Sequence, residues 1–179
     1  MGEITAIDLR KMTDFGKVNI RLARDGEFDA IWPILRGVIR AGETYAIDPK
    51  ISREGAYELW MNAPRATYVA EADGEILGTY YIKTNQAGGG AHVCNCGYMV
   101  SEAARGRGLA ARMCEHSQAE ALKLGYRAMQ FNLVLATNTG AIHLWHKLGF
   151  DTVGRLPLAF DHPQSGLVDA LVMYKWLEF

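Results

Sequence analysis

The sequence predicts an α+β fold in which helices flank a central mixed β-sheet. The length of 179 residues suits a single domain better than two. Apolar residues make up 49% of the chain and charged residues 22%, the composition of an ordinary globular domain with one buried core. Segments with alternating apolar residues and segments with helical spacing follow one another without an internal repeat, which favours one mixed sheet over a solenoid.

Periodicity and turn residues predict the elements in order. Apolar alternation or apolar runs predict strands over 18–22, 67–72, 76–83, 92–100, 128–135, 150–156 and 168–176. Helical spacing predicts helices over 28–39 (capped by Asp25), 57–61, 105–123 and 138–148 (capped by Asn138). Pro33 should kink the first helix or delay its start. Residues 1–16 show no clear period, so we expect an N-terminal arm of uncertain structure followed by a domain over 17–179.

Charge and cysteine usage exclude several classes of protein. The 19 basic and 20 acidic side chains give a net charge of −1, which argues against a nucleic-acid partner. Cys94, Cys96 and Cys114 are odd in number and lack metal-ligand spacing, so we expect neither a disulfide framework nor a metal site. The sequence shows no secretory signal and no stretch of about 20 apolar residues. These features predict a cytoplasmic protein without a membrane partner.

The segment most informative about function joins a predicted strand to a predicted helix through Arg105-Gly106-Arg107-Gly108. Glycines let a backbone approach a ligand closely, and the first turn of a helix carries unpaired, partly positive N–H groups. Such a turn binds pyrophosphate, and two arginines add charge and donors there. A tight turn with solvated arginines remains the alternative. Neither GxGxxG nor a P-loop ending is present.

Two motifs resemble those of the GNAT superfamily of acetyltransferases. Arg105–Ala110 is similar to its R/Q-x-x-G-x-G/A signature, and residues 138–150 are similar to its N-x-x-A-x-x-x-Y-x-x-x-G-F element. The resemblance implies a GNAT-like domain and an enzyme that uses acetyl-CoA as cosubstrate, without a metal. Carried over by position, it implies cofactor contacts from Met99, Val100, Arg105, Gly106, Arg107, Gly108, Leu109, Ala110, Asn138 and Trp145.

Position 145 departs from the superfamily pattern. A tyrosine usually stands there, close to the thiolate leaving group, whereas this chain has Trp145. An indole N–H donates a hydrogen bond but is not a proton source. The leaving thiolate would then take its proton from water or from another residue such as Tyr98.

Three further segments resemble the N-acetyltransferases of proline analogues such as azetidine-2-carboxylate: residues 81–85, 92–98 and 131–134. The resemblance implies that Asn95, Tyr98 and Asn132 are catalytic and that, with Leu133, they bind the substrate. Both asparagines stand in apolar strands, where an unpaired buried amide costs about 1–3 kcal/mol. Each should therefore have a partner, which is either a ligand or neighbouring backbone and water. Because Asn95 and Tyr98 face opposite sides of a regular strand, a bulge between them would be needed to bring them together.

The sequence therefore predicts direct transfer of an acetyl group to the amine of a small molecule, with an imino acid or proline analogue as one candidate. Alternatives are an acetyltransferase for a protein N-terminus or an antibiotic amine, and a non-catalytic acyl-CoA sensor. A homodimer is one expected assembly. His92, His143 and His146 are candidate general bases, but His143 and His146 share a helix face that we expect to be solvated. Glu43, Tyr45 and Asp161 lie in predicted loops that could reach a substrate, but the sequence alone does not place them.

Overall fold

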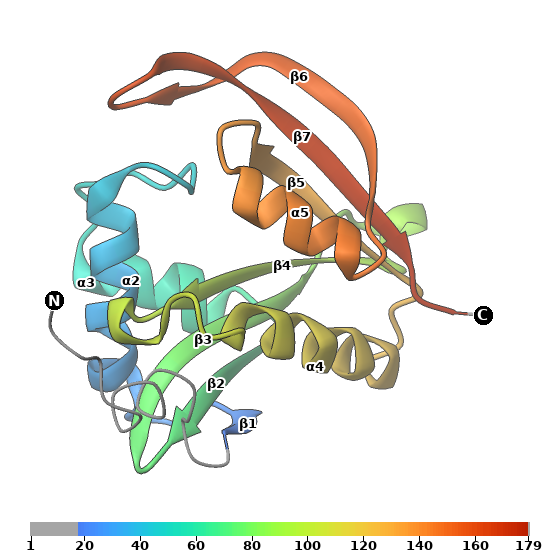
Figure 1. Cartoon of the computed structure of the whole chain (residues 1–179). Helices are drawn as coiled ribbons and strands as arrows, with labels where there is room; N and C mark the ends of the chain where they lie inside the picture. Colours follow the sequence, from blue (N-terminus) through green and yellow to red (C-terminus); the bar gives the residue numbers. More distant parts are fainter. Residues whose placement is uncertain (1–17, 179) are drawn as a thin grey trace, which may run out of the picture.

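Seven strands form one sheet in the order β1-β2-β3-β4-β5-β7-β6 in a computed structural model that describes residues 18–178 (Figure 1). The strands are β1 (Asn19–Leu22), β2 (Ala66–Ala72), β3 (Glu75–Thr84), β4 (Val93–Val100), β5 (Ala128–Leu135), β6 (Asp151–His162) and β7 (Gly166–Trp176). The helices are α2 (Phe28–Ala41), α3 (Arg53–Tyr57), α4 (Leu109–Lys123) and α5 (Thr139–Lys147). The predicted α+β class and order of strands and helices are confirmed. The predicted N-terminal arm over 1–16 lies outside the described residues.

Strands β4 and β5 are the parallel neighbours in an otherwise antiparallel sheet. Each has eight residues, yet their register holds only at Val93↔Ala128 and Cys94↔Met129. Beyond these two pairs the strands diverge. The sheet is therefore mixed, as predicted, and it is split in the middle.

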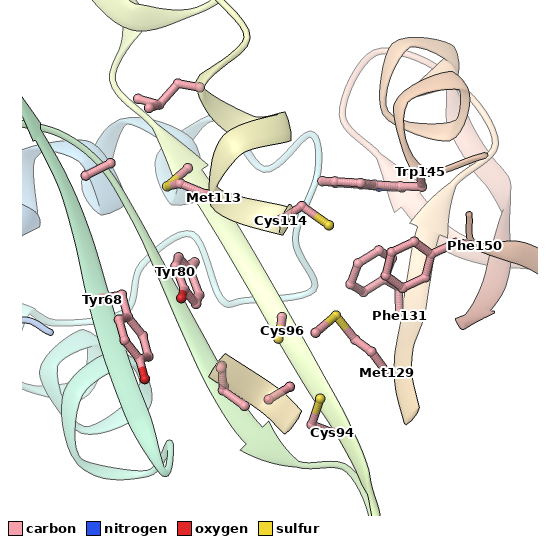
Figure 2. Close-up of a cluster of buried hydrophobic side chains, with 14 of the residues drawn as sticks. Tyr68, Tyr80, Cys94, Cys96, Met113, Cys114, Met129, Phe131, Trp145 and Phe150 are labelled. Atoms are coloured by element: carbon pink, nitrogen blue, oxygen red, sulfur yellow. The ribbon is translucent and has the colours of Figure 1, made fainter. Parts of the chain in front are cut away.

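Two apolar clusters cover the two faces of the sheet. Helices α4 and α5 pack on one face over the larger cluster, and Figure 2 shows Trp145, Phe131 and Phe150 gathered on the β5 side of it. Helices α2 and α3 pack on the other face, where Ile31 and Leu35 are wholly buried. Burial of a large apolar side chain contributes about 1.5–3 kcal/mol, so both clusters hold the sheet between its helices.

Helix α4 begins at Leu109, whereas the sequence analysis placed its start at Arg105. Gly106 and Gly108 have φ angles of +73° and +75°, which a right-handed helix does not allow. A short 3-10 turn over Glu102–Ala104 comes first, and residues 105–108 form the turn that enters the helix.

Helix α2 begins at Phe28 and contains Pro33, so the proline does not delay the start of the helix. Its N-cap is Glu27, not Asp25. The Glu27 carboxylate accepts from the Arg24 backbone N–H at 2.7 Å and pairs with Arg21. Glu27 thus fixes the turn before the helix through an ion pair with β1.

The remaining differences are extensions of predicted elements. Ser52 caps α3 by accepting from the Gly55 N–H at 3.0 Å, and a π-helical turn over Glu58–Asn62 continues that helix. The last hairpin is longer than expected, since β6 runs to His162 and β7 begins at Gly166. Most of β6 is exposed, because as the edge strand it projects beyond the helices (Figure 1).

The Arg21 ion pairs predict how stability depends on pH. Arg21 contacts Glu27 at 2.7 Å and Glu71 at 2.5 Å, and the hydrogen bond from Arg21 lowers the pKa of Glu27 from 4.5 to about 2. A folded-state pKa below the unfolded value contributes stability above pH ~4.5 that is lost as the pH falls toward 2. Urea unfolding from pH 7 to pH 3 should therefore show a smaller loss of stability in Glu27→Gln than in the wild type. The exposed Glu75 serves as control, and an E75Q variant should follow the wild-type pH profile.

Candidate active site

The loop before α4 presents peptide groups to solvent. Residues 105–108 are exposed, and a Cβ added to Gly106 or Gly108 would meet nothing within 4 Å. Gly108 is the N-cap of α4 and supplies no side-chain cap, so the first N–H groups of the helix have no capping side chain. The Leu109 side chain is buried in the core, so only the backbone of this residue can serve a ligand. The turn and helix start together have the geometry of an anion site.

A cleft of about 490 Å³ begins beside this loop and follows the split between β4 and β5. Its walls include most of the side chains that the sequence singled out. Those lining it are Asn95, Tyr98, Met99, Val100, Arg105, Ala110, Asn132, Leu133, Asn138 and Trp145. Gly106, Arg107, Gly108 and Leu109 are not among the lining residues, although their neighbours Arg105 and Ala110 are. Arg105 and Glu43 are the charged residues among those that line it.

Asn95 and Tyr98 lie on opposite faces of β4, and the bulge that would have turned them to one side is absent from the β3–β4 pairing. Their register runs without a shift from Gly78↔Val100 to Thr84↔Cys94. The irregularity lies on β5, where Phe131 pairs Met173 and Val134 pairs Leu171, leaving two residues against one on β7. The split of the sheet, and not a bulge in β4, allows one cleft to reach both faces.

The two asparagines have different surroundings. Asn95 is buried, donates from Nδ2 to the Gln130 carbonyl at 2.9 Å, and accepts from the Tyr81 hydroxyl at 3.3 Å. Asn132 is exposed, which corrects the expectation of a buried amide, because the β5 bulge turns it outward. It donates to Asn85 Oδ1 at 2.7 Å and accepts from Gln130 Nε2 at 2.9 Å. Both amides therefore have protein partners, and only Asn132 can meet a ligand without leaving a buried group unpaired.

Trp145 closes the cleft from the α5 side. Its ring lies 5.4 Å from that of Tyr98 and 5.0 Å from that of Phe131, and in Figure 2 it extends toward Cys114 of α4. The Tyr98 hydroxyl is hydrogen-bonded to Ser117 Oγ at 2.7 Å, on the face that α4 covers. Burial raises the pKa of Tyr98 well above its ordinary value. The raised pKa disfavours transfer of the Tyr98 proton to the leaving thiolate.

Two tyrosines complete the opposite wall: Tyr45, which the sequence placed in a loop able to reach a substrate, and Tyr81, to which no role was assigned. Tyr45, in the loop between α2 and α3, bonds through its hydroxyl to the backbone of Tyr98 on β4. Tyr81 on β3 lies over Gly97, where a Cβ would come within 2.8 Å of its ring. A glycine inside a strand indicates such a close approach, so Gly97 is the position in the sequence that could have indicated a contact with a large side chain. Burial raises the pKa of Tyr81 to about 12.

Asn138 has a structural role at the cleft. Its Oδ1 accepts from the Ala141 N–H at 3.1 Å and caps α5, as predicted. The amide N–H groups of Asn138 remain the donors that can reach a ligand.

The histidines and Asp161 lie outside the cleft wall. His143 and His146 are exposed, as expected, and His92 packs against Trp176 at 6.3 Å. Within residues 18–178 no cluster of His, Cys, Asp and Glu could hold a metal ion. In that same part of the chain, no helix combines the length and hydropathy of a membrane span.

A family model described as "Acetyltransferase (GNAT) family" matches residues 32–150, a segment that contains the cleft and the glycine-arginine loop. The chain belongs to this family. Its expected GNAT membership is thereby confirmed, and the matched region contains β4 and β5, the split between them and the loop before α4.

Relatives extend this assignment to the activity. N-acetyltransferase aca1 of Schizosaccharomyces pombe is 33% identical over 151 residues, covering 75% of this chain and 72% of that protein. A GCN5-related N-acetyltransferase from Kribbella flavida is 43% identical, with a TM-score of 0.84 over 89% of this chain and 97% of the other. The yncA structure from Salmonella typhimurium contains acetyl-CoA and shares the fold at 21% identity, with a TM-score of 0.79 over 92% and 96% of the two chains. The protein is thus an acetyltransferase of the GNAT family, which disfavours a non-catalytic sensor.

The glycine-arginine loop predicts a cofactor variant. Gly108→Val adds a β-branched side chain in the space before the helix N-terminus and strains a residue whose φ is +75°. Calorimetry should show a dissociation constant for acetyl-CoA at least tenfold higher, about 1.4 kcal/mol. Gly26→Val is the control, because Gly26 also has a positive φ and open space but is not among the residues that line the cleft. Unchanged affinity in a folded G108V protein would remove this loop from the cofactor site.

Proposed function

We propose that the enzyme transfers the acetyl group of acetyl-CoA directly to the amine of a small molecule, with an imino acid such as a proline analogue as the leading candidate. The observation that carries this proposal is the cleft of about 490 Å³, whose lining includes Arg105 of the loop before α4 and the polar side chain of Asn132. Clefts of 300–1,000 Å³ suit small ligands. Because this space must also admit the acyl end of the cosubstrate, the acceptor has to be small.

The donor set at the mouth of the cleft fits the pyrophosphate of acetyl-CoA. Arg105 lines the cleft, and the uncapped N-terminus of α4 lies directly behind the two glycines. Phosphate oxygens accept from such N–H groups and from guanidinium. Met99 and Val100 line the next stretch of wall, where the β4 backbone can pair with the amide-bearing arm of the cosubstrate.

The far end of the cleft supports an acceptor that carries both an amine and a carboxylate. Asn132 has two amide N–H groups and donates only one of them to Asn85 among the described residues. Lys83 lies over the Tyr81 ring at 5.1 Å from its centroid, which adds a positive charge beside this end. Glu43, held by Gln164 at 2.8 Å, adds the negative charge that an ammonium group would meet. Opposite charges at the two sides of the cleft suit a small amino or imino acid.

The main task of the protein in this reaction is to position the two reactants. Acetyl-CoA supplies an activated acetyl group, and the chain holds an amine in line with it. Negative charge that develops on the thioester oxygen is stabilised by N–H groups of β4 that face the split. The side chains lining the acceptor end include amides and hydroxyls, so a water chain can remove the surplus proton from the amine.

A screen for CoA release tests the proposal. Imino acids, including azetidine-2-carboxylate, would be compared with aminoglycosides, phosphinothricin and peptides with a free N-terminus. We expect turnover with the small amino or imino acids. Turnover only with peptides would show that the cleft admits a protein N-terminus and would replace the proposal by that alternative.

Asn132→Ala tests the acceptor site. If Asn132 donates to a carboxylate, kcat/KM for the acceptor should fall about 10- to 100-fold while the dissociation constant for acetyl-CoA stays constant. Asn62→Ala is the matched control, since Asn62 is an exposed amide that bonds only to Glu58 in the described chain. Equal losses in thermal stability, without a specific loss in acceptor use, would assign Asn132 a structural role only.

We also propose that two copies associate through the β6–β7 hairpin. Strand β6 is the edge of the sheet, and Val153, Leu158 and Leu167 are each about 60% exposed along the hairpin. Leu158 has a φ of +50° and is held there by the Asp169 carboxylate, which accepts from its N–H at 2.9 Å. An apolar edge strand is usually covered in solution. Light scattering should give a dimer, and Leu158→Lys should give the monomer mass of 19.8 kDa.

A further inference from the structure

The peptide groups of Tyr98 open into the split between β4 and β5. Odd-numbered residues of β4 pair with β3: the Val93 carbonyl accepts from the Asn85 N–H at 2.9 Å. At the other end of the strand, the Ser101 N–H donates to the Leu77 carbonyl at 2.8 Å. In an antiparallel pair the intervening residues face the other side, here toward β5. Since the β4–β5 pairing ends at Cys94, Tyr98 presents its N–H and its C=O to the cleft.

One hydroxyl satisfies both groups. Tyr45 accepts from the Tyr98 N–H at 2.8 Å and donates to the Tyr98 carbonyl at 2.6 Å. The ring of Tyr45 packs edge-on against Trp60 at 6.5 Å, which anchors the loop between α2 and α3 at this point. Any ligand that lies along β4 as an added strand has to take the Tyr98 N–H from this hydroxyl.

We propose that Tyr45 is a catalytic residue that donates a hydrogen bond to the thioester oxygen. When the thioester carbonyl of acetyl-CoA lies along β4, its oxygen accepts a hydrogen bond from the Tyr98 N–H. The Tyr45 oxygen, which accepts that bond in the free enzyme, is then displaced by about one hydrogen-bond length. The hydroxyl then turns its proton from the Tyr98 carbonyl to the same thioester oxygen. Two donors thus meet the negative charge as it develops. The inference rests on the proposed transfer from acetyl-CoA; the kinetic test below uses the proposed acceptor, whereas the hydrogen-exchange test does not depend on it.

The hydroxyl acts as a donor and keeps its proton throughout. Burial raises the pKa of Tyr45, so loss of the phenolic proton is disfavoured. The amine lone pair forms the C–N bond, the C–S electron pair leaves on sulfur, and water takes the surplus proton from nitrogen and returns one to the thiolate. The other cleft tyrosines are engaged elsewhere, Tyr98 with Ser117 and Tyr81 with Asn95. Tyr45 is therefore the phenol best placed to serve in this chain, whose Trp145 replaces the family's usual tyrosine.

Tyr45→Phe separates this role from packing. With azetidine-2-carboxylate as acceptor, kcat should fall about 100-fold while the dissociation constant for acetyl-CoA stays the same or falls. The control is Tyr126→Phe, which removes a buried phenol hydroxyl bonded to Thr84 at 2.7 Å, outside the cleft. It should lower thermal stability without lowering kcat. If the Y45F enzyme kept the full kcat, the Tyr45 hydroxyl would serve only to pair the peptide groups of Tyr98, and the proposal would be overturned.

Amide hydrogen exchange gives a readout that does not need turnover. In Y45F without ligand, the Tyr98 N–H should exchange at least tenfold faster than in the wild type, because its acceptor is gone. Acetyl-CoA should restore the protection, whereas CoA without an acetyl group should not. Protection restored equally by CoA would show that the thioester oxygen does not reach Tyr98, which contradicts the proposal. If wild-type protein bound no acetyl-CoA, the proposed function itself would fail instead.

Discussion

Strands β4 and β5 are hydrogen-bonded neighbours only at their first residues, and their later separation exposes peptide groups that a continuous sheet would pair. A buried N–H without an acceptor costs about 1–3 kcal/mol, so a sheet tolerates such a split only if something else satisfies the strand edge. In this chain the Tyr45 hydroxyl does so at Tyr98. The cleft, its reach to both faces and its polar lining all follow from this separation.

Large aromatic side chains hold the separation open. Trp145, Phe131 and Phe150 occupy the space on the α5 face, where a continuous β4–β5 pairing would leave them no room. On the other face Tyr81 packs edge-on against Trp60 at 4.8 Å, and Gly97 leaves the space for its ring. Because packed interiors do not deform continuously, these two clusters fix the width of the split. The cleft is therefore a product of the core and not of mobile loops.

Local patterns in the sequence predicted local features of the site. The glycine-arginine turn, the cap at Asn138 and the order of strands and helices depend on neighbouring residues, and the structure has all three. The exposure of Asn132 depends on a bulge that β7 imposes, about 40 residues further along the chain, and no pattern within β5 marks it. Tyr45 meets Tyr98 across 53 positions, so its role was likewise hidden. Periodicity gives the face of a regular strand, and it fails where the sheet is irregular.

The two walls of the cleft differ in the side chains that they provide: the α5 wall carries Trp145, and the opposite wall carries Tyr45 and Tyr81. A tryptophan fills more of the split than a tyrosine would, and its contacts with Tyr98 and Phe131 stabilise the α5 wall. It brings no hydroxyl, so any phenol that serves the thioester must come from the opposite wall. The loop between α2 and α3 carries Tyr45, the phenol that we propose for this role. The same loop carries Glu43, which lines the cleft. In the proposed mechanism, acetyl positioning by Tyr45 and acceptor recognition by Glu43 thus depend on one loop, whereas the loop before α4 is a separate segment of the chain. If these proposed roles hold, substitutions between α2 and α3 should alter acceptor use without altering the affinity for acetyl-CoA.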